Sequence, residues 1–160
     1  MVSRNEQRSH QGAVLQPYSK RCVYAMRALA YAAALHPGRR FRAAAVCRQA
    51  GVPEPFTRKV LHLLVESGLL TAHRGPGGGY ALSRPPGEIT LLEIVLAIDD
   101  AFDTRRCVMG FGPCGANGPC PLHHATERCS TMLEGVLHDH TLAQLVESVT
   151  LRERFIPTTK

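Results

Sequence analysis

The chain has 160 residues, 44% of them hydrophobic, enough for one packed domain with an appendage. No run of about 18 apolar residues occurs, so we expect no membrane-spanning helix, and the polar stretch 1–19 does not resemble a signal peptide. These features favour a cytoplasmic protein, in which the six cysteines serve metal binding or redox chemistry rather than a disulfide framework.

The net charge of +6 is divided unevenly along the chain. Residues 1–87 contain 13 Lys and Arg against 3 Asp and Glu, a net charge of +10, whereas residues 88–160 contain 6 against 10, a net charge of −4. A basic half joined to an acidic half is typical of a nucleic-acid-binding module attached to a unit that does not touch phosphate. An ordinary solvated surface is the other interpretation, and it fits so sharp a division less well.

The N-terminal half begins with a polar arm, residues 1–17, that we expect to be disordered. An Ala- and Leu-rich stretch then predicts a helix over Lys20–Leu35, ended by a proline and a glycine. A short helix is predicted over Phe41–Ala50, ended by Gly51. A third helix over Glu54–Glu66 follows, with proline near its first turn, where a missing N–H group is harmless.

Two short apolar runs, Leu69–Ala72 and Gly79–Leu82, flank a glycine-rich turn and predict a β-hairpin. Three helices and a hairpin over residues 18–87 predict a mainly α fold, the winged helix-turn-helix, with the third helix in a DNA major groove and the hairpin as the wing. Glycine-rich turns also bind nucleotide phosphates, but this one lacks the strand-to-helix setting and the Lys-Ser/Thr ending of a P-loop.

Residues 88–150 are expected to form a second unit for metal binding and dimerisation. It begins with a helix over Ile89–Asp99, capped by Thr90, and continues with a long helix over Leu122–Leu137 whose apolar residues recur every three or four positions. A last short helix is predicted from Thr141, and residues 151–160 form a tail. A second copy of the chain is the expected cover for the long helix; folding back onto the winged unit is the alternative.

Between these helices, Cys107, Cys114 and Cys120 are followed by His123 in a segment rich in glycine and proline. Such a composition prevents regular structure, and a loop that carries several thiolates can surround a soft metal ion or an iron–sulfur cluster. Three thiolates and an imidazole also describe a structural zinc site, and the residues alone leave both possibilities open.

Four motifs occur in order: YAMRAL at residues 24–29, RGPGGGYAL at 74–82, ITLLEIVLAID at 89–99, and the cysteine run ending in CPLH at 120–123. Together they resemble the Rrf-type family of bacterial transcription regulators, with its IscR-, NsrR- and RirA-like branches, from about Tyr18 to Val146. The resemblance implies a winged-helix dimer joined by a long antiparallel helix pair. It also implies an iron–sulfur cluster that is coupled to DNA binding.

The resemblance places Cys107, Cys114 and Cys120 on the family's three cysteines, and His123 on the non-cysteine ligand of the IscR-like branch. The implied cofactor is a [2Fe–2S] or [4Fe–4S] cluster. Val23 stands where NsrR-like members carry an acidic ligand, and valine cannot bind iron. The first cysteine gap is one residue longer than in the IscR and NsrR patterns. The alternative fourth ligands are Cys22, His124 and Cys129, and Cys22, Cys129 and Cys47 can equally be packing residues.

The predicted DNA contacts are Thr57, Arg58 and Lys59 in the third helix and Arg74, Gly77 and Tyr80 in the wing. Arg58 can donate two hydrogen bonds to guanine O6 and N7. The resemblance places it where IscR-like members read a base with an acidic residue, which implies a different operator, and it matches Arg74 to a family arginine that reaches DNA. Arg42 and Arg48 are expected phosphate contacts. For each of these residues a solvated surface charge is the alternative.

The sequence therefore predicts a homodimeric transcription regulator that binds a double-stranded DNA operator. Through an iron–sulfur cluster it senses iron, nitric oxide or redox state. We find no constellation of catalytic residues, so we expect no enzymatic activity. The alternative is a zinc- or thiol-stabilised nucleic-acid-binding or assembly protein without a sensing cluster.

Overall fold

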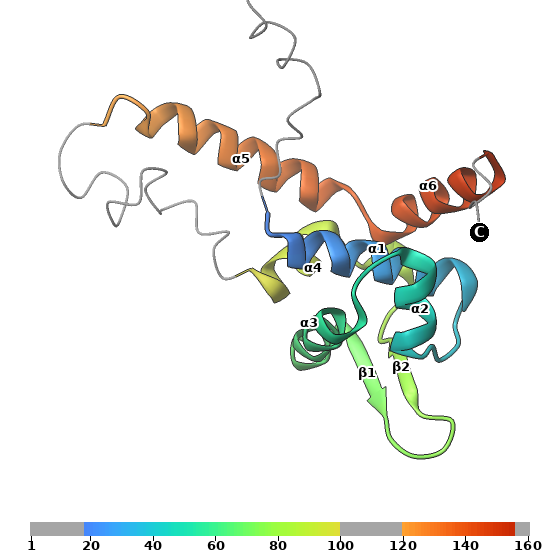
Figure 1. Cartoon of the computed structure of the whole chain (residues 1–160). Coiled ribbons are helices and arrows are strands. Elements are labelled where there is room, and N and C mark those ends of the chain that lie inside the picture. The colour runs from blue at the N-terminus through green and yellow to red at the C-terminus, as the bar shows by residue number, and fades with distance from the viewer. Residues whose placement is uncertain (1–17, 100–119, 156–160) are drawn as a thin grey trace, which may run out of the picture.

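The computed structural model describes residues 18–99 and 120–155, and the side chains among these up to residue 148. The predicted arm at 1–17, Cys107 and Cys114 lie outside the described residues. The described elements are α1 (Lys20–Leu35), α2 (Ala43–Ala50), α3 (Glu54–Glu66), β1 (Leu70–His73), β2 (Gly79–Leu82), the 3₁₀ turn η2 (Pro86–Glu88), α4 (Leu91–Ile98), α5 (His123–Asp139) and α6 (Leu142–Phe155) (Figure 1).

Helix α1 lies at the centre of the fold. Half of its residues are buried, because alanine and leucine recur around most of its circumference. The hydroxyl of Ser19 accepts a hydrogen bond from the amide of Cys22 and caps the helix. Leu29 of α1, Leu64 of α3 and Leu142 of α6 are fully buried in the same core, so residues from both expected units pack together.

Helices α2 and α3 form the helix-turn-helix. α2 ends at Gly51, whose φ of 63° and ψ of 41° are left-handed values that glycine adopts without strain. The predicted start of α2 at Phe41 was wrong. The amide of Phe41 donates to the carbonyl of Tyr80 at 2.8 Å, and the amide of Tyr80 donates back at 2.9 Å. Phe41 is thus bridged to the wing, and α2 begins two residues later.

The wing is the predicted antiparallel hairpin, with Leu70 opposite Leu82 and His73 opposite Gly79. A Cβ atom at Gly79 would lie 2.4 Å from the carbonyl oxygen of Phe41, so only glycine permits this close backbone approach. The hairpin projects from the body at the end opposite α5 and α6 (Figure 1).

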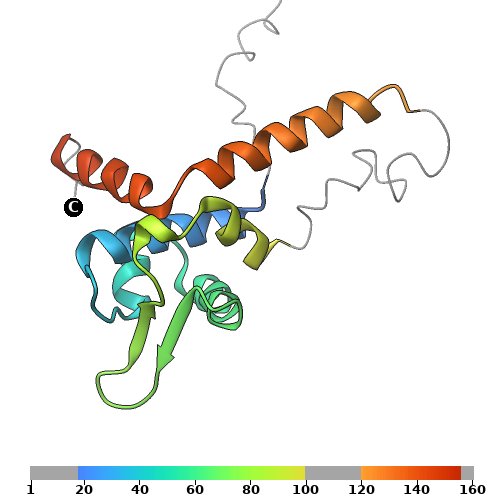
Figure 2. The ribbon, with the colours of Figure 1, turned by 180° about the vertical axis from the view of Figure 1, so that it is seen from behind.

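The C-terminal helices close back on the N-terminal half. Thr90 and Glu93 form a capping box at the start of α4, which confirms the predicted cap. Helix α5 packs against α4 and projects beyond the body (Figures 1 and 2). Helix α6 has 14 residues, more than the short helix expected, and lies along α1. None of the described helices is long and apolar enough to span a bilayer.

Candidate nucleic-acid interface and metal centre

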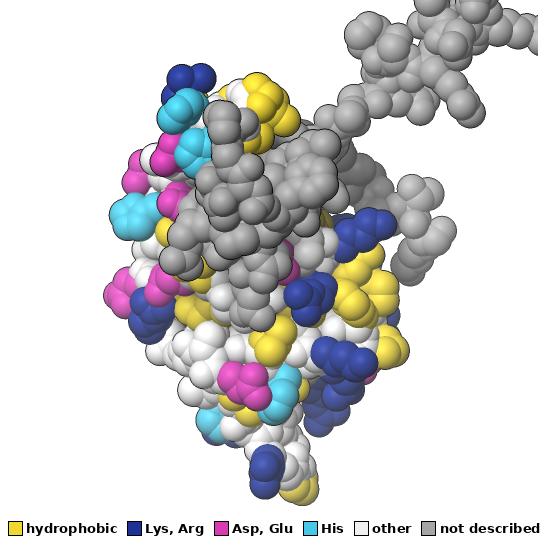
Figure 3. All heavy atoms as spheres, turned by 90° about the vertical axis from the view of Figure 1, so that its left-hand side faces the viewer, with side chains coloured by type: hydrophobic (Ala, Val, Ile, Leu, Met, Phe, Trp, Pro, Cys, Tyr) yellow, Lys and Arg dark blue, Asp and Glu magenta, His cyan; other side chains and the backbone are white. Residues whose placement is uncertain are grey.

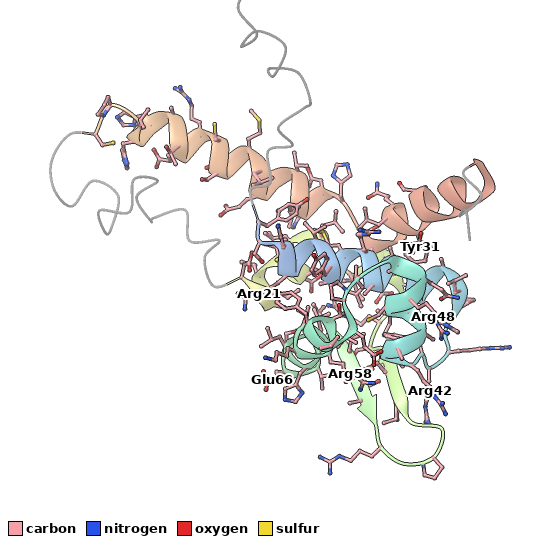
Figure 4. All side chains as sticks on the ribbon, viewed as in Figure 1. Arg21, Tyr31, Arg42, Arg48, Arg58 and Glu66 are labelled. Carbon is pink, nitrogen blue, oxygen red and sulfur yellow. The ribbon has the colours of Figure 1, made fainter. Side chains whose placement is uncertain are left out.

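The exposed residues of α3 nearest its start include Arg58 and Lys59. Arg58 has 56% of its side chain exposed. Figure 4 shows it on the wing side of the molecule, together with Arg42 and Arg48 of the α2 region. In a space-filling view, Lys and Arg side chains gather along one flank, and Asp and Glu lie mainly along the other (Figure 3). A cationic face on the wing side suits contact with a phosphate backbone.

Thr57 was wrongly predicted to contact DNA. Its side chain is fully buried, and its hydroxyl donates a hydrogen bond to the carbonyl of Pro53 at 2.8 Å. Thr57 lies on the same face of α3 as Val60, Leu61 and Leu64, which are also buried. The three- and four-residue spacing of these positions marks the inner face of a helix, so the sequence contained the signal that Thr57 faces the core.

Arg58 already has an acidic partner, which was not predicted from the sequence. Its Nε and Nη2 atoms donate to the same Oε1 atom of Glu54, at 2.8 and 2.6 Å. Glu54 raises the pKa of the Arg58 guanidinium, first through the hydrogen bond and then through its charge. A glutamate four residues before an arginine is a known helix pairing, so the spacing could have revealed this contact.

In the wing, Arg74 and Gly77 are exposed at the turn and Tyr80 is half-buried. The ring of Tyr80 lies against Phe41, with 6.0 Å between the ring centroids. Arg74 thus lies on a projecting turn, whereas Tyr80 packs against Phe41 at the base of the wing. These placements are compatible with DNA contact by Arg74 and Gly77.

Two of the four predicted metal ligands, Cys120 and His123, lie in the described part of the chain. The amide of His123 donates to the carbonyl of Cys120 at 3.1 Å, so both residues belong to the turn that starts α5. Their backbones are thereby joined at a helix N-terminus, where the helix dipole favours anionic ligands. This donor set fits an iron–sulfur cluster and also fits zinc.

His124 and Glu127 lie beside His123. One ligand atom from each of the three residues lies within 4.8 Å of the others, and the rings of the two histidines are 5.1 Å apart. Both His124 and Glu127 are exposed. The position of His124 is therefore compatible with a role as the fourth ligand in place of His123.

Cys22 and Cys47 are buried, and Cys129 is exposed on α5. Burial, and then the neighbouring Asp99, raises the pKa of the Cys22 thiol to about 12. The Sγ atom of Cys22 faces the carbonyl of Val95 at 3.9 Å. Cys22 and Cys47 are 0% and 2% exposed, and this burial supports the packing role for both.

Asp99, the last described residue before the cysteine segment, is bound to the start of α1. Its carboxylate accepts hydrogen bonds from the amide and the hydroxyl of Ser19, at 2.7 and 2.6 Å, and lies 3.4 Å from Arg21. Burial raises the pKa of Asp99, but the bonds from Ser19 and the charge of Arg21 outweigh it, so the net pKa is lowered. This contact was not predicted from the sequence, because 80 positions separate Ser19 from Asp99.

Several known proteins are similar to this chain. An HTH-type transcriptional regulator of Aquifex aeolicus is 30% identical over 131 residues, which are 81% of this chain and 90% of that relative. The IscR regulator of Cronobacter sakazakii is 32% identical over 103 residues, 64% of this chain and 63% of IscR. The match to IscR thus spans just under two thirds of that relative.

Solved structures share the fold. IscR of T. potens superposes with a TM-score of 0.61 at 22% identity, covering 86% of this chain and 91% of that one. CymR, the global cysteine regulator of B. subtilis, superposes with a TM-score of 0.65 at 19% identity, covering 81% and 95%. The predicted winged helix is confirmed. Residues 18–148 match the model of the Rrf2 family, described as iron-dependent transcriptional regulator, and the chain belongs to this family of transcription regulators.

Proposed function

We propose that this chain binds its operator as a homodimer and couples that binding to an iron–sulfur cluster held by Cys107, Cys114, Cys120 and His123. The observation that carries the proposal is the position of Cys120 and His123 on one turn at the start of α5, at the end of the cysteine run. The place of action would be the cytoplasm, where thiols stay reduced.

The chain supplies the ligands and their orientation. The hydrogen bond from His123 to Cys120 fixes the backbone of both residues, and the N-terminus of α5 favours negative charge beside them. A bound cluster supplies a centre whose potential and integrity depend on redox state, iron supply and nitric oxide. An imidazole in place of one thiolate removes negative charge and raises the potential of such a centre.

DNA is bound by the basic half. Arg58 and Lys59 would enter the major groove with α3, and Arg74 and Gly77 would follow the neighbouring backbone with the wing. Arg42 and Arg48 extend the cationic surface beside α2. A palindromic operator with half-sites about one helical turn apart follows from two-fold symmetry.

A second copy of the chain is the proposed cover for α5. Met132 and Val136, one turn apart, are 72% and 50% exposed, whereas Leu137 on the inner face is buried. An exposed apolar row on a projecting helix is typical of a helix that pairs with a copy of itself. The pairing would set the spacing between the two α3 helices.

The path from the metal centre to DNA runs through two described contacts. Asp99 joins the N-terminal end of the cysteine segment to Ser19 at the start of α1, and Cys120 joins its C-terminal end to α5. A change at the centre is thereby passed to a helix of the DNA-binding core and to the proposed dimer helix. Allosteric coupling of this kind changes affinity by about 5- to 150-fold.

Anaerobic isolation tests the centre. The protein should contain iron and acid-labile sulfide, and alanine at Cys107, Cys114 or Cys120 should abolish both. His123→Ala should leave a labile or spectrally shifted cluster. Cys47→Ala is the control, since Cys47 is a buried cysteine of α2 that belongs neither to the proposed ligands nor to their alternatives. Stoichiometric zinc without sulfide in the wild-type protein would favour the zinc-stabilised alternative.

Sedimentation tests the assembly. Met132→Glu combined with Val136→Glu should yield monomers that bind the operator poorly, because charges replace the proposed apolar contact. Thr131→Glu with His138→Glu adds the same residues at exposed polar positions of α5 and should leave the dimer intact. A wild-type monomer at micromolar concentration would refute the homodimer.

A further inference from the structure

The contact between Glu54 and Arg58 constrains the side chain with which we expect α3 to read a base. Both residues lie on α3, four positions apart, with 36% and 56% of their side chains exposed. One carboxylate oxygen, Oε1, receives both Nε–H and one N–H of Nη2. Glu54 is in the first helical turn, where the helix dipole favours its negative charge.

This geometry divides the guanidinium into an occupied and an open edge. Arginine presents five N–H donors in a rigid fork. Glu54 occupies the edge formed by Nε and Nη2, which leaves the outer edge formed by Nη1 and Nη2 for another acceptor. Two parallel N–H donors on one edge are what guanine O6 and N7 require.

We infer that Glu54 is a positioning residue for DNA recognition, which holds Arg58 with its outer edge open to a guanine. The inference rests on the proposed role of Arg58 in reading a base. A guanidinium held before DNA arrives loses less rotamer freedom on binding, and its direction is fixed more narrowly. Glu54 thereby acts through Arg58 rather than by touching the base.

The charge of Glu54 argues against a simple phosphate-binding role for Arg58. A carboxylate beside a phosphate-binding arginine cancels its charge and repels the phosphate, so it weakens binding to every sequence. At a base-reading arginine the same carboxylate still repels the DNA backbone, but it increases discrimination between bases. Glu54 is therefore expected to lower affinity for arbitrary DNA and to raise selectivity for the operator.

The test uses the full chain and duplexes that the wild-type protein selects from a random pool. Dissociation constants for the selected duplex, its single-base variants and a scrambled duplex are measured at one salt concentration. Glu54→Gln should bind scrambled DNA more tightly than wild type and should lower the ratio of specific to scrambled affinity about tenfold. The preference should flatten at one base pair of each half-site.

Glu66→Gln is the matched control. Glu66 is the last residue of α3, at the opposite end from Glu54, and makes an exposed contact of 3.4 Å with His62, also four positions apart. Its substitution removes the same charge from the same helix and should change affinity for the two duplexes equally. In an Arg58→Ala background, Glu54→Gln should leave the affinity ratio unchanged, because the residue it positions is gone.

Three outcomes would overturn the inference. Glu54→Gln could strengthen binding to selected and scrambled duplexes by the same factor, which would make Glu54 only a repulsive charge. It could also match Glu66→Gln in every measurement, or lower the ratio equally with and without Arg58. If Arg58→Ala alone weakens binding to both duplexes equally, Arg58 does not read a base, and the proposed function of Arg58 fails independently of Glu54. Thermal unfolding of each variant checks that the fold is retained.

Discussion

Replacing Asp99 by asparagine probes the contact between the end of α4 and the start of α1. The side chain of Asp99 is only 7% exposed, and its carboxylate accepts hydrogen bonds from the amide and the hydroxyl of Ser19 at 2.7 and 2.6 Å. Hydrogen bonds to a charged group contribute about 1.5–3 kcal/mol each, so this pair contributes about 3–6 kcal/mol. Asparagine keeps one acceptor oxygen and turns a donor toward Ser19. We therefore expect the free energy of unfolding to fall by about 2–3 kcal/mol at neutral pH.

Chemical unfolding of the metal-free, reduced chain measures this loss. Because folding lowers the pKa of Asp99, the stabilisation is present above the ordinary carboxyl pKa of about 3.9 and disappears as the pH falls through the lower, folded-state value. Ser19→Ala removes the hydroxyl bond to Asp99 together with the cap on the amide of Cys22, and its loss should be non-additive with that of Asp99→Asn. Asp139→Asn, at an exposed carboxylate on α5, is the control. A loss below about 0.5 kcal/mol for Asp99→Asn, within the range of ordinary surface substitutions, would show that this contact does not stabilise the fold appreciably.

Further predictions concern the wing, the buried thiol and the phosphate contacts. Gly79→Ala should destabilise the fold by about 1–3 kcal/mol and weaken DNA binding, because its Cβ would clash with the carbonyl of Phe41. Gly87→Ala is the control, since a Cβ there meets open space, and it should be nearly neutral in thermal unfolding. Burial and Asp99 raise the pKa of Cys22 to about 12, above the ordinary thiol value of about 8.5. The free energy of unfolding of the wild type, relative to that of Cys22→Ala, should thus fall by about 1.4 kcal/mol per pH unit between about pH 9 and about pH 11. The same pH dependence in both proteins would contradict this. Arg42→Ala should weaken binding to all duplexes alike and reduce the salt slope by about one, and a sequence-dependent loss would exclude a phosphate contact.

Much of the fold could be predicted because local signals agreed with tertiary packing. The bounds of α1 and α3 were predicted correctly, since an apolar helical period is bordered by glycine or proline at both helices. The start of α2 was wrong because the backbone bridge from Phe41 to Tyr80 joins residues 39 positions apart. The length of α6 was underestimated because polar residues continue the helix with no breaking residue.

In the candidate site, the placement of residues close together in sequence could largely be predicted, whereas contacts between distant residues could not. Cys120 and His123 lie three residues apart, and a backbone hydrogen bond joins them across the turn that starts α5. Arg58 and Lys59 are exposed as expected, whereas Thr57 belongs to the buried face. The partner of Asp99 could not be inferred, because a contact between distant segments depends on how α1 and α4 pack.

The anchoring of residues on both sides of the cysteine segment bears on how such regulators diversify. Asp99 is hydrogen-bonded to Ser19. Beyond α5 the chain is held again by two backbone hydrogen bonds, from the amide of Leu91 to the carbonyl of His140 and from the amide of Leu142 to the carbonyl of Ile89. Lengthening a loop between fixed ends costs little, about 0.6 kcal/mol for each doubling. We therefore expect insertions, deletions and substitutions between the anchors to leave the fold of the DNA-binding half intact. If the proposed function holds, evolution can exchange the ligands of the metal centre without changing the residues that bind DNA.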